Sequence, residues 1–85
     1  MDLEEYLIEN RAGTFSLTMK GNAMQEEGIL DGDLVIVERG RTPKARGIVV
    51  AEIDDEYKLR KMSSLKPNQK TTIIAVVIAI VRKYR

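Results

Sequence analysis

An uninterrupted apolar stretch near the end of the chain, residues 73–81, constrains the fold more than any other feature of the sequence. All nine of its residues are β-branched or alanine, so we expect residues 71–84 to be strand through most of their length. Nine residues are too few for a membrane-spanning helix, which needs ~20. Both faces of this strand are apolar, and an exposed strand of that kind is an aggregation hazard. The stretch is therefore either a central strand in the core or a surface that packs on a second subunit.

Two earlier segments also have strand patterns. Residues 14–19 alternate strictly and place Phe15, Leu17 and Met19 on one face, which is typical of a half-buried strand. Residues 34–37 are apolar on both faces, as expected for a strand deep in a sheet.

The middle of the chain predicts a hairpin and a short helical turn. Residues 48–53 and 57–62 have strand composition, and an acidic tight turn at 54–56 is expected to join them. A helical turn is expected at 24–27, where Gly28 would end it.

The N-terminal segment is the exception to this β-rich pattern. Leu3, Tyr6 and Leu7 form one apolar stripe, which predicts a short helix over residues 2–10. Turn signals recur every eight to twelve residues, and no linker divides the chain. We expect a single mainly β domain over residues 1–85, a partly open barrel of antiparallel strands with one short N-terminal helix.

The sequence lacks the residue types that most often carry catalysis near neutral pH. It has no cysteine, which excludes thiolate catalysis and zinc-thiolate sites, and no histidine. Asp31 and Asp33 flank a glycine and are explained by turn formation, because a hard-cation site needs several more oxygens. We therefore expect no metal and no cofactor. The acidic N-terminus does not resemble a signal peptide, so a cytoplasmic location is expected.

Charge is divided unevenly along the chain. Residues 1–42 hold nine acids and four bases, whereas residues 43–85 hold ten bases and four acids. The bases are scattered and aromatic residues make up only 5% of the chain, so a base-stacking platform is poorly supplied. Two differently charged solvated faces are the expected result, without direct binding of nucleic acid or membrane.

Several segments together resemble the peptidase domain of the LexA/UmuD family, the S24 peptidases. The residues that carry the resemblance are 21–24, 28–37, 47–51 and 56–62. It spans residues 2–62 and resumes over 75–85, where the sequence is similar to the family's last strand. Processed UmuD is the nearest branch, because residues 2–8 resemble the segment that opens its core. The implied fold is the small LexA/UmuD peptidase-like barrel.

The resemblance implies a self-cleaving Ser-Lys dyad, in which a serine attacks and a neutral buried lysine takes its proton. In this sequence Ala23 stands at the nucleophile position and Arg60 at the base position. A methyl group cannot attack a carbonyl, and a guanidinium stays protonated in proteins. Lys61 is adjacent to the base position, but neighbouring strand residues point to opposite faces. We therefore expect a pseudoenzyme with no functional catalytic residue.

Further departures surround the vestigial dyad. Asn22 replaces the family's aspartate, and Arg46 replaces the glycine of the Gly-Asp pair before residues 48–50. The segment between Met62 and Thr71 is much shorter than in the family, which predicts that one or two strands are trimmed. We also expect no DNA-binding domain and no cleavable N-terminal arm in residues 1–85.

The predicted function is a catalytically inactive protein-interaction domain, a dimerising regulator or accessory subunit in the SOS response to DNA damage and in translesion DNA repair. The resemblance implies a homodimer or a heterodimer with a UmuD- or LexA-like subunit, and a translesion polymerase or RecA as further partners. The residues expected at the interface lie in the last strand: Ile74, Val76, Ile78 and Ile80. Two alternatives remain, an engineered or degenerate form of a Ser-Lys self-cleaving S24 peptidase and an anti-repressor of a mobile element.

Overall fold

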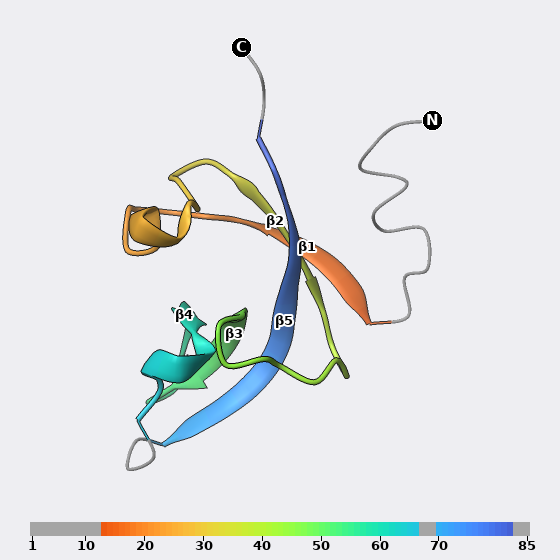
Figure 1. Ribbon diagram of the computed structural model, residues 1–85, viewed down its shortest axis with the longest axis vertical. Helices are drawn as coiled ribbons and strands as arrows, with labels where there is room; N and C mark the ends of the chain where they lie inside the picture. Colours follow the sequence, from red (N-terminus) through yellow and green to blue (C-terminus); the bar gives the residue numbers. More distant parts are fainter. Residues whose placement is uncertain (1–12, 67–69, 83–85) are drawn as a thin grey trace.

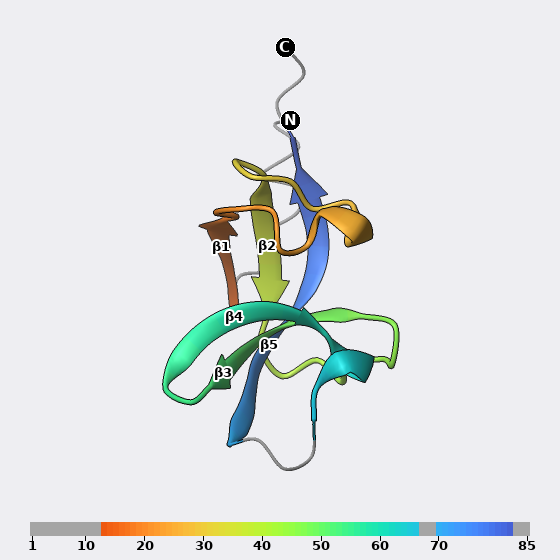
Figure 2. The ribbon, with the colours of Figure 1, turned by 90° about the vertical axis from the view of Figure 1, so that its left-hand side faces the viewer.

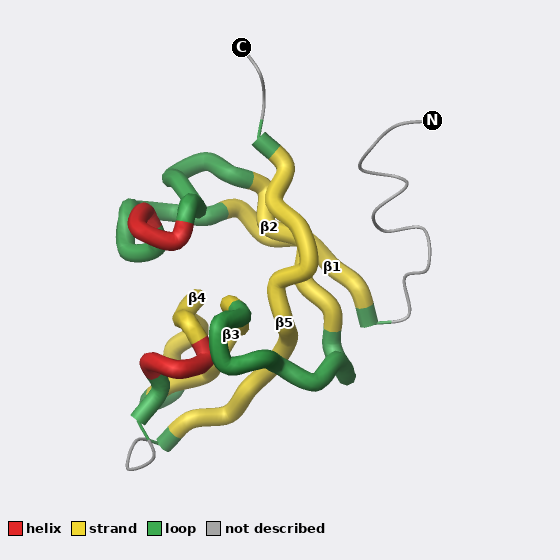
Figure 3. Tube along the Cα trace, viewed as in Figure 1, coloured by secondary structure: helices red, strands yellow, loops and turns green. Residues whose placement is uncertain are grey.

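The computed structural model describes residues 13–66 and 70–82. They form five strands and two single 3₁₀ turns, as drawn in Figures 1 and 3. The elements are β1 (Thr14–Thr18), η1 (Gln25–Glu27), β2 (Leu34–Glu38), β3 (Ile48–Ile53), β4 (Glu56–Lys61), η2 (Met62–Ser64) and β5 (Thr71–Val81). The expected helix over residues 2–10 lies outside the described residues. No helix in the described part of the chain is long and apolar enough to cross a membrane.

The five strands form one antiparallel sheet in the order β1-β2-β5-β3-β4. This arrangement confirms the mainly β, antiparallel fold expected from the sequence. The last strand in the chain is the central strand of the sheet, hydrogen-bonded to β2 along residues 76–81 and to β3 along residues 71–76. Figure 2 shows the result, with β1 and β2 in one half of the molecule, β3 and β4 in the other, and β5 running through both.

Two β-bulges allow β5 to serve both halves. In the pairing of β5 with β2, Ile78 has no partner residue, and in the pairing of β5 with β3, Ile74 has none. A bulge bends the strand and increases its local twist. The sheet therefore curls without closing, and β1 and β4 remain its edge strands.

The core consists of two clusters on opposite faces of the β3 region. The larger cluster lies between the two halves of the sheet and contains Met19, Met24, Ile29, Val35, Val37, Val50, Leu59 and Ala75. The smaller cluster contains Val49, Ala51, Ile53 and Val76. Val35, Ile36 and Val37 of β2 are all fully buried. This strand is therefore covered on both faces, as its sequence predicts.

The β3–β4 hairpin is confirmed, with a turn one residue shorter than expected. Asp54 and Asp55 alone form the loop, and Glu56 already belongs to β4. Both loop residues have positive φ, 52° and 70°, as a two-residue type I′ turn requires. Aspartate tolerates this conformation better than most residues because its short side chain can hydrogen-bond locally.

Candidate functional site

A groove between the two edge strands brings Ala23 and Arg60 together. It has a volume of about 380 Å³, and it is lined by β1, the segment that follows β1, and β4. Its lining residues are Leu17, Thr18, Met19, Lys20, Ala23, Tyr57, Lys58, Leu59 and Arg60. We call this cavity the edge groove. The two positions assigned to the vestigial dyad, 37 residues apart in the sequence, thus line one cavity.

Backbone hydrogen bonds hold the segment that carries Ala23. The Gly21 N–H donates to Asp31 Oδ1 at 2.6 Å, and the Ile29 N–H donates to the Met24 carbonyl at 3.1 Å. The Met24 side chain is buried in the larger core cluster, directly after the exposed Ala23. Gly28 ends η1 with a φ of 86°, as expected from the sequence. Ala23 is therefore presented at the surface of a segment fixed on both sides.

Arg60 is positioned by the edge strand β4. It pairs with Val49 of β3, and its Nη1 donates a hydrogen bond of 2.7 Å to the carbonyl of Leu59. The adjacent Lys61 is directed elsewhere, because its Nζ lies 3.8 Å from Glu27 Oε2 on η1. The structure thus places Arg60, and not Lys61, along the edge groove.

The chemistry of the edge groove follows from its side chains. Its hydroxyl groups belong to Thr18 and Tyr57 and its amines to Lys20 and Lys58, and no hydrogen bond joins a hydroxyl to an amine among these described residues. A serine-type nucleophile needs a base within hydrogen-bond reach. A paired nucleophile and base are therefore not found among the described residues that line the edge groove.

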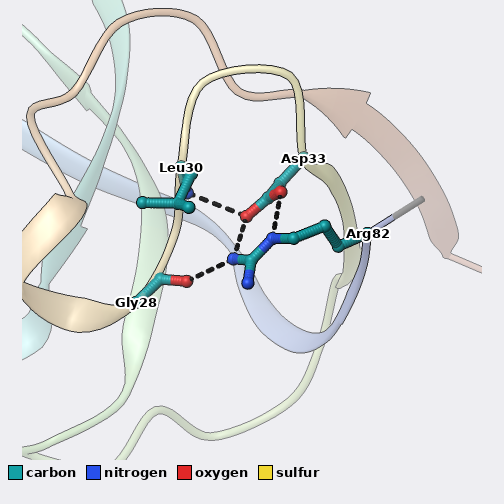
Figure 4. A network of polar contacts seen from close by, with 4 residues as sticks. All are labelled: Gly28, Leu30, Asp33 and Arg82. Carbon is teal, nitrogen blue, oxygen red and sulfur yellow. Dashed lines mark hydrogen bonds and ion pairs between the residues drawn. The ribbon is translucent and has the colours of Figure 1, made fainter. Parts of the chain in front are cut away.

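A bidentate ion pair in the described structure was not predicted from the sequence. Arg82, directly after β5, binds Asp33 through Nε to Oδ1 at 2.8 Å and through Nη2 to Oδ2 at 2.6 Å (Figure 4). The same Nη2 donates to the Gly28 carbonyl at 2.8 Å, and the Leu30 N–H donates to Asp33 Oδ2 at 2.8 Å. We call these contacts the Asp33–Arg82 clamp. It joins the end of β5 to the segment that carries Ala23.

The clamp changes the ionisation of its carboxylate. Asp33 is only 3% exposed. The hydrogen bonds from Arg82 and, second, from the Leu30 backbone lower the pKa of Asp33 from 3.8 to about 2, against an opposing effect of burial. The same contact raises the pKa of Arg82. Asp33 therefore stays ionised at any ordinary pH.

Asp31 and Asp33 both serve the turn before β2, as their spacing suggested. Asp31 accepts from the Gly21 backbone and Asp33 from the Leu30 backbone. Within residues 13–66 and 70–82, no three acidic side chains gather closely enough to hold a metal ion.

The residues expected at a subunit interface have different surroundings. Val76 is buried in the smaller core cluster, and Ile74 and Ile80 pack against the larger one. Ile78, at its bulge, is half-buried and lines a shallow cavity of about 270 Å³ together with Lys44 and other residues of the β2–β3 connection. Strand β5 is hydrogen-bonded to β2 only over residues 76–81 and to β3 only over residues 71–76, so each neighbouring strand covers about half of its length.

Comparisons with known proteins agree with the resemblance seen in the sequence. The peptidase S24-like family matches residues 1–76. Protein ImpA of Salmonella typhimurium is 39% identical over 62 residues, which cover 73% of this chain and 43% of ImpA. Protein SamA of the same species is 37% identical over 67 residues, or 79% of this chain and 47% of SamA.

The LexA repressor of Leptospira biflexa is 34% identical over 103 aligned positions, which cover 98% of this chain and 51% of the repressor. Because this chain has only 85 residues, the repressor carries at least 18 residues in the matched region that this chain lacks. The chain spans about half the length of the curated relatives it matches, or less.

Proposed function

Because this chain belongs to the peptidase S24-like family, we propose that it is a catalytically inactive interaction domain of the LexA/UmuD type. In this proposal it acts as a dimerising regulator or accessory subunit in the SOS response and translesion DNA repair. The observation that carries the proposal is the edge groove, which brings Ala23 and Arg60 onto one surface but offers neither a serine nor a lysine at those positions.

The proposed inactivity rests on two chemical substitutions. Ala23 has no hydroxyl with which to form an acyl-enzyme, and Arg60 carries a guanidinium that does not give up its proton near neutral pH. The groove nevertheless lies between β1 and β4, the two strands that have a single strand neighbour among the described residues. An extended segment of a related subunit could add to such an edge through main-chain hydrogen bonds. The domain would then hold a cleavable segment without cutting it.

The proposed partner is a second LexA- or UmuD-like subunit, identical or related. Ile78 supports this choice, because it is apolar and half-buried and belongs to neither core cluster among the described residues. Packing of its face against an equivalent face would remove apolar surface from water, which favours association. A translesion polymerase or RecA would bind the assembled dimer.

Oligomeric state tests the dimer. Light scattering after size-exclusion chromatography should give twice the chain mass at micromolar concentration. Ile78→Asp should convert the protein to monomer, since it would bury a charge in an apolar contact. Thr72→Asp is the matched control, because Thr72 is exposed on the same strand and should leave the dimer intact. A wild-type monomer at micromolar concentration would refute this part of the proposal.

Cleavage in trans tests the inactivity. The full chain is incubated with a LexA-like relative whose own nucleophile is removed but whose cleavable arm is intact, and products are identified by mass spectrometry. We expect no cleavage by the wild-type chain. Cleavage would contradict the proposal. The double variant Ala23→Ser with Arg60→Lys tests the alternative that the chain is a degenerate Ser-Lys peptidase. Cleavage by this variant would support that alternative, because it would show that restoring the two residues restores activity.

A further inference from the structure

A second cavity on β4 is strongly cationic. It has a volume of about 190 Å³ and is lined by Ile53, Lys58, Arg60, Ser64, Leu65 and Lys66. We call it the cationic pocket. Three positively charged side chains line it and no acidic one does, although the chain as a whole carries a net charge of only +1.

The cations of the pocket are largely unused by the protein itself. Arg60 uses one of its five N–H donors, in the bond to the Leu59 carbonyl. Neither Arg60 nor Lys66 has a carboxylate within ion-pair distance among the described residues. Lys58 lies 3.4 Å from Glu56, but that carboxylate is 72% exposed and does not line the pocket. Like charges held together without a counterion repel one another, and a bound anion would remove that repulsion.

The base of the pocket is apolar and fixed. Ile53 is buried in the smaller core cluster, and Leu65 packs against that cluster. An apolar wall lowers the local dielectric and strengthens attraction to an anion. The Ser64 hydroxyl donates a hydrogen bond of 2.7 Å to the Lys61 carbonyl, which holds the segment after β4. The three cations therefore remain as the donors for a ligand.

We propose that the cationic pocket binds phosphate, either as the free dianion or as a phosphomonoester. The volume of about 190 Å³ is below the ~300 Å³ at which sites for drug-sized ligands begin. A pocket of this size admits one tetrahedral oxyanion together with bridging water. Three cations match a dianion better than a singly charged carboxylate. No aromatic residue lines the pocket to stack a base, which argues against a nucleic-acid strand. This inference stands apart from the proposed function.

The test is a titration of the ¹⁵N-labelled full chain with inorganic phosphate, at an ionic strength held constant with chloride. Saturable shifts are expected in the amides of residues 53, 58–60 and 64–66. Arg60→Gln and Lys66→Gln should each weaken binding about tenfold, which corresponds to ~1.4 kcal/mol. Lys44→Gln is the matched control, since Lys44 is exposed and lines a different cavity. It should change the affinity less than about twofold, within the scatter of distant surface changes.

Parallel titrations identify the source of the phosphate group. Glycerol 3-phosphate binding as tightly as inorganic phosphate would assign the pocket to a phosphomonoester, and binding of inorganic phosphate alone would assign it to the free ion. Absence of saturation, shifts spread over all basic residues, or equal losses with Lys44→Gln would overturn the proposal. Binding of a short single-stranded DNA without binding of phosphate would overturn it as well. Denaturation curves confirm that each variant is folded.

Discussion

Ile29 gives the sharpest test of how the segment carrying Ala23 is held in place. Its side chain is 1% exposed, and it lies in the larger core cluster with Met24. Ile29→Ala removes three carbon atoms, each worth about 0.8 kcal/mol of transfer free energy. Incomplete collapse of the resulting cavity adds to this loss, so we expect the free energy of unfolding to fall by about 3–4 kcal/mol. That is a large share of the roughly 4–13 kcal/mol typical of a domain with 85 residues.

The chain supplies a matched control in the next residue. Leu30, like Ile29, has a four-carbon aliphatic side chain, but it is 41% exposed. Leu30→Ala should therefore cost no more than about 1 kcal/mol, because less apolar surface returns to water. Urea denaturation followed by circular dichroism measures both, with unchanged m-values as the sign of two-state unfolding. A loss below about 1 kcal/mol for Ile29→Ala, or equal losses for both variants, would refute the account of this core.

Three further predictions concern the backbone and the clamp. The folded protein holds the pKa of Asp33 at about 2, below its ordinary 3.8, so the stability contributed by this carboxylate is present above about pH 4 and is lost as pH falls toward 2. Acid titration of unfolding should show this loss in the wild type and a flatter profile in Asp33→Asn; identical profiles would contradict it. Asp55→Gly should raise the free energy of unfolding by about 0.5–1 kcal/mol, since glycine adopts the φ of 70° without strain, and a decrease would show that the turn is held otherwise. Gly28→Ala should lower the free energy of unfolding by about 1 kcal/mol, because alanine is strained at a φ of 86°. No atom lies within 4 Å of the added Cβ, so this backbone strain is the whole expected effect. An unchanged midpoint of urea denaturation would contradict this prediction.

Local patterns in the sequence predict the strands because each pattern reflects a local cause. The alternation of residues 14–19 and the apolar run at 34–37 describe how a pleated strand distributes its side chains, and both segments are strands in the structure. The hairpin is equally local, and only its turn length differs. Asp54 and Asp55 accept positive φ, so two residues complete a turn for which three were expected.

Pairing between distant segments has no comparable local signal. Apolar composition predicts that residues 73–81 need cover on both faces, but it does not reveal that β5 lies between β2 and β3. The bulges at Ile74 and Ile78 depend on that placement, since they lie on either side of Val76, the residue that pairs with both β2 and β3. The Asp33–Arg82 clamp joins residues 49 positions apart, and either residue alone reads as an ordinary surface charge.

Arg60 connects the two cavities described above, because it lines both the edge groove and the cationic pocket. A lysine that serves as a base must lose its proton easily, which requires burial and the absence of a nearby anion. An anion site needs the opposite, a charge that persists when the ligand is bound, and arginine provides it. On our two proposals, arginine at position 60 thus removes the base and supplies a donor for phosphate. Arg60→Lys separates these roles: it should preserve part of the phosphate affinity, while cleavage should still be absent because Ala23 offers no nucleophile.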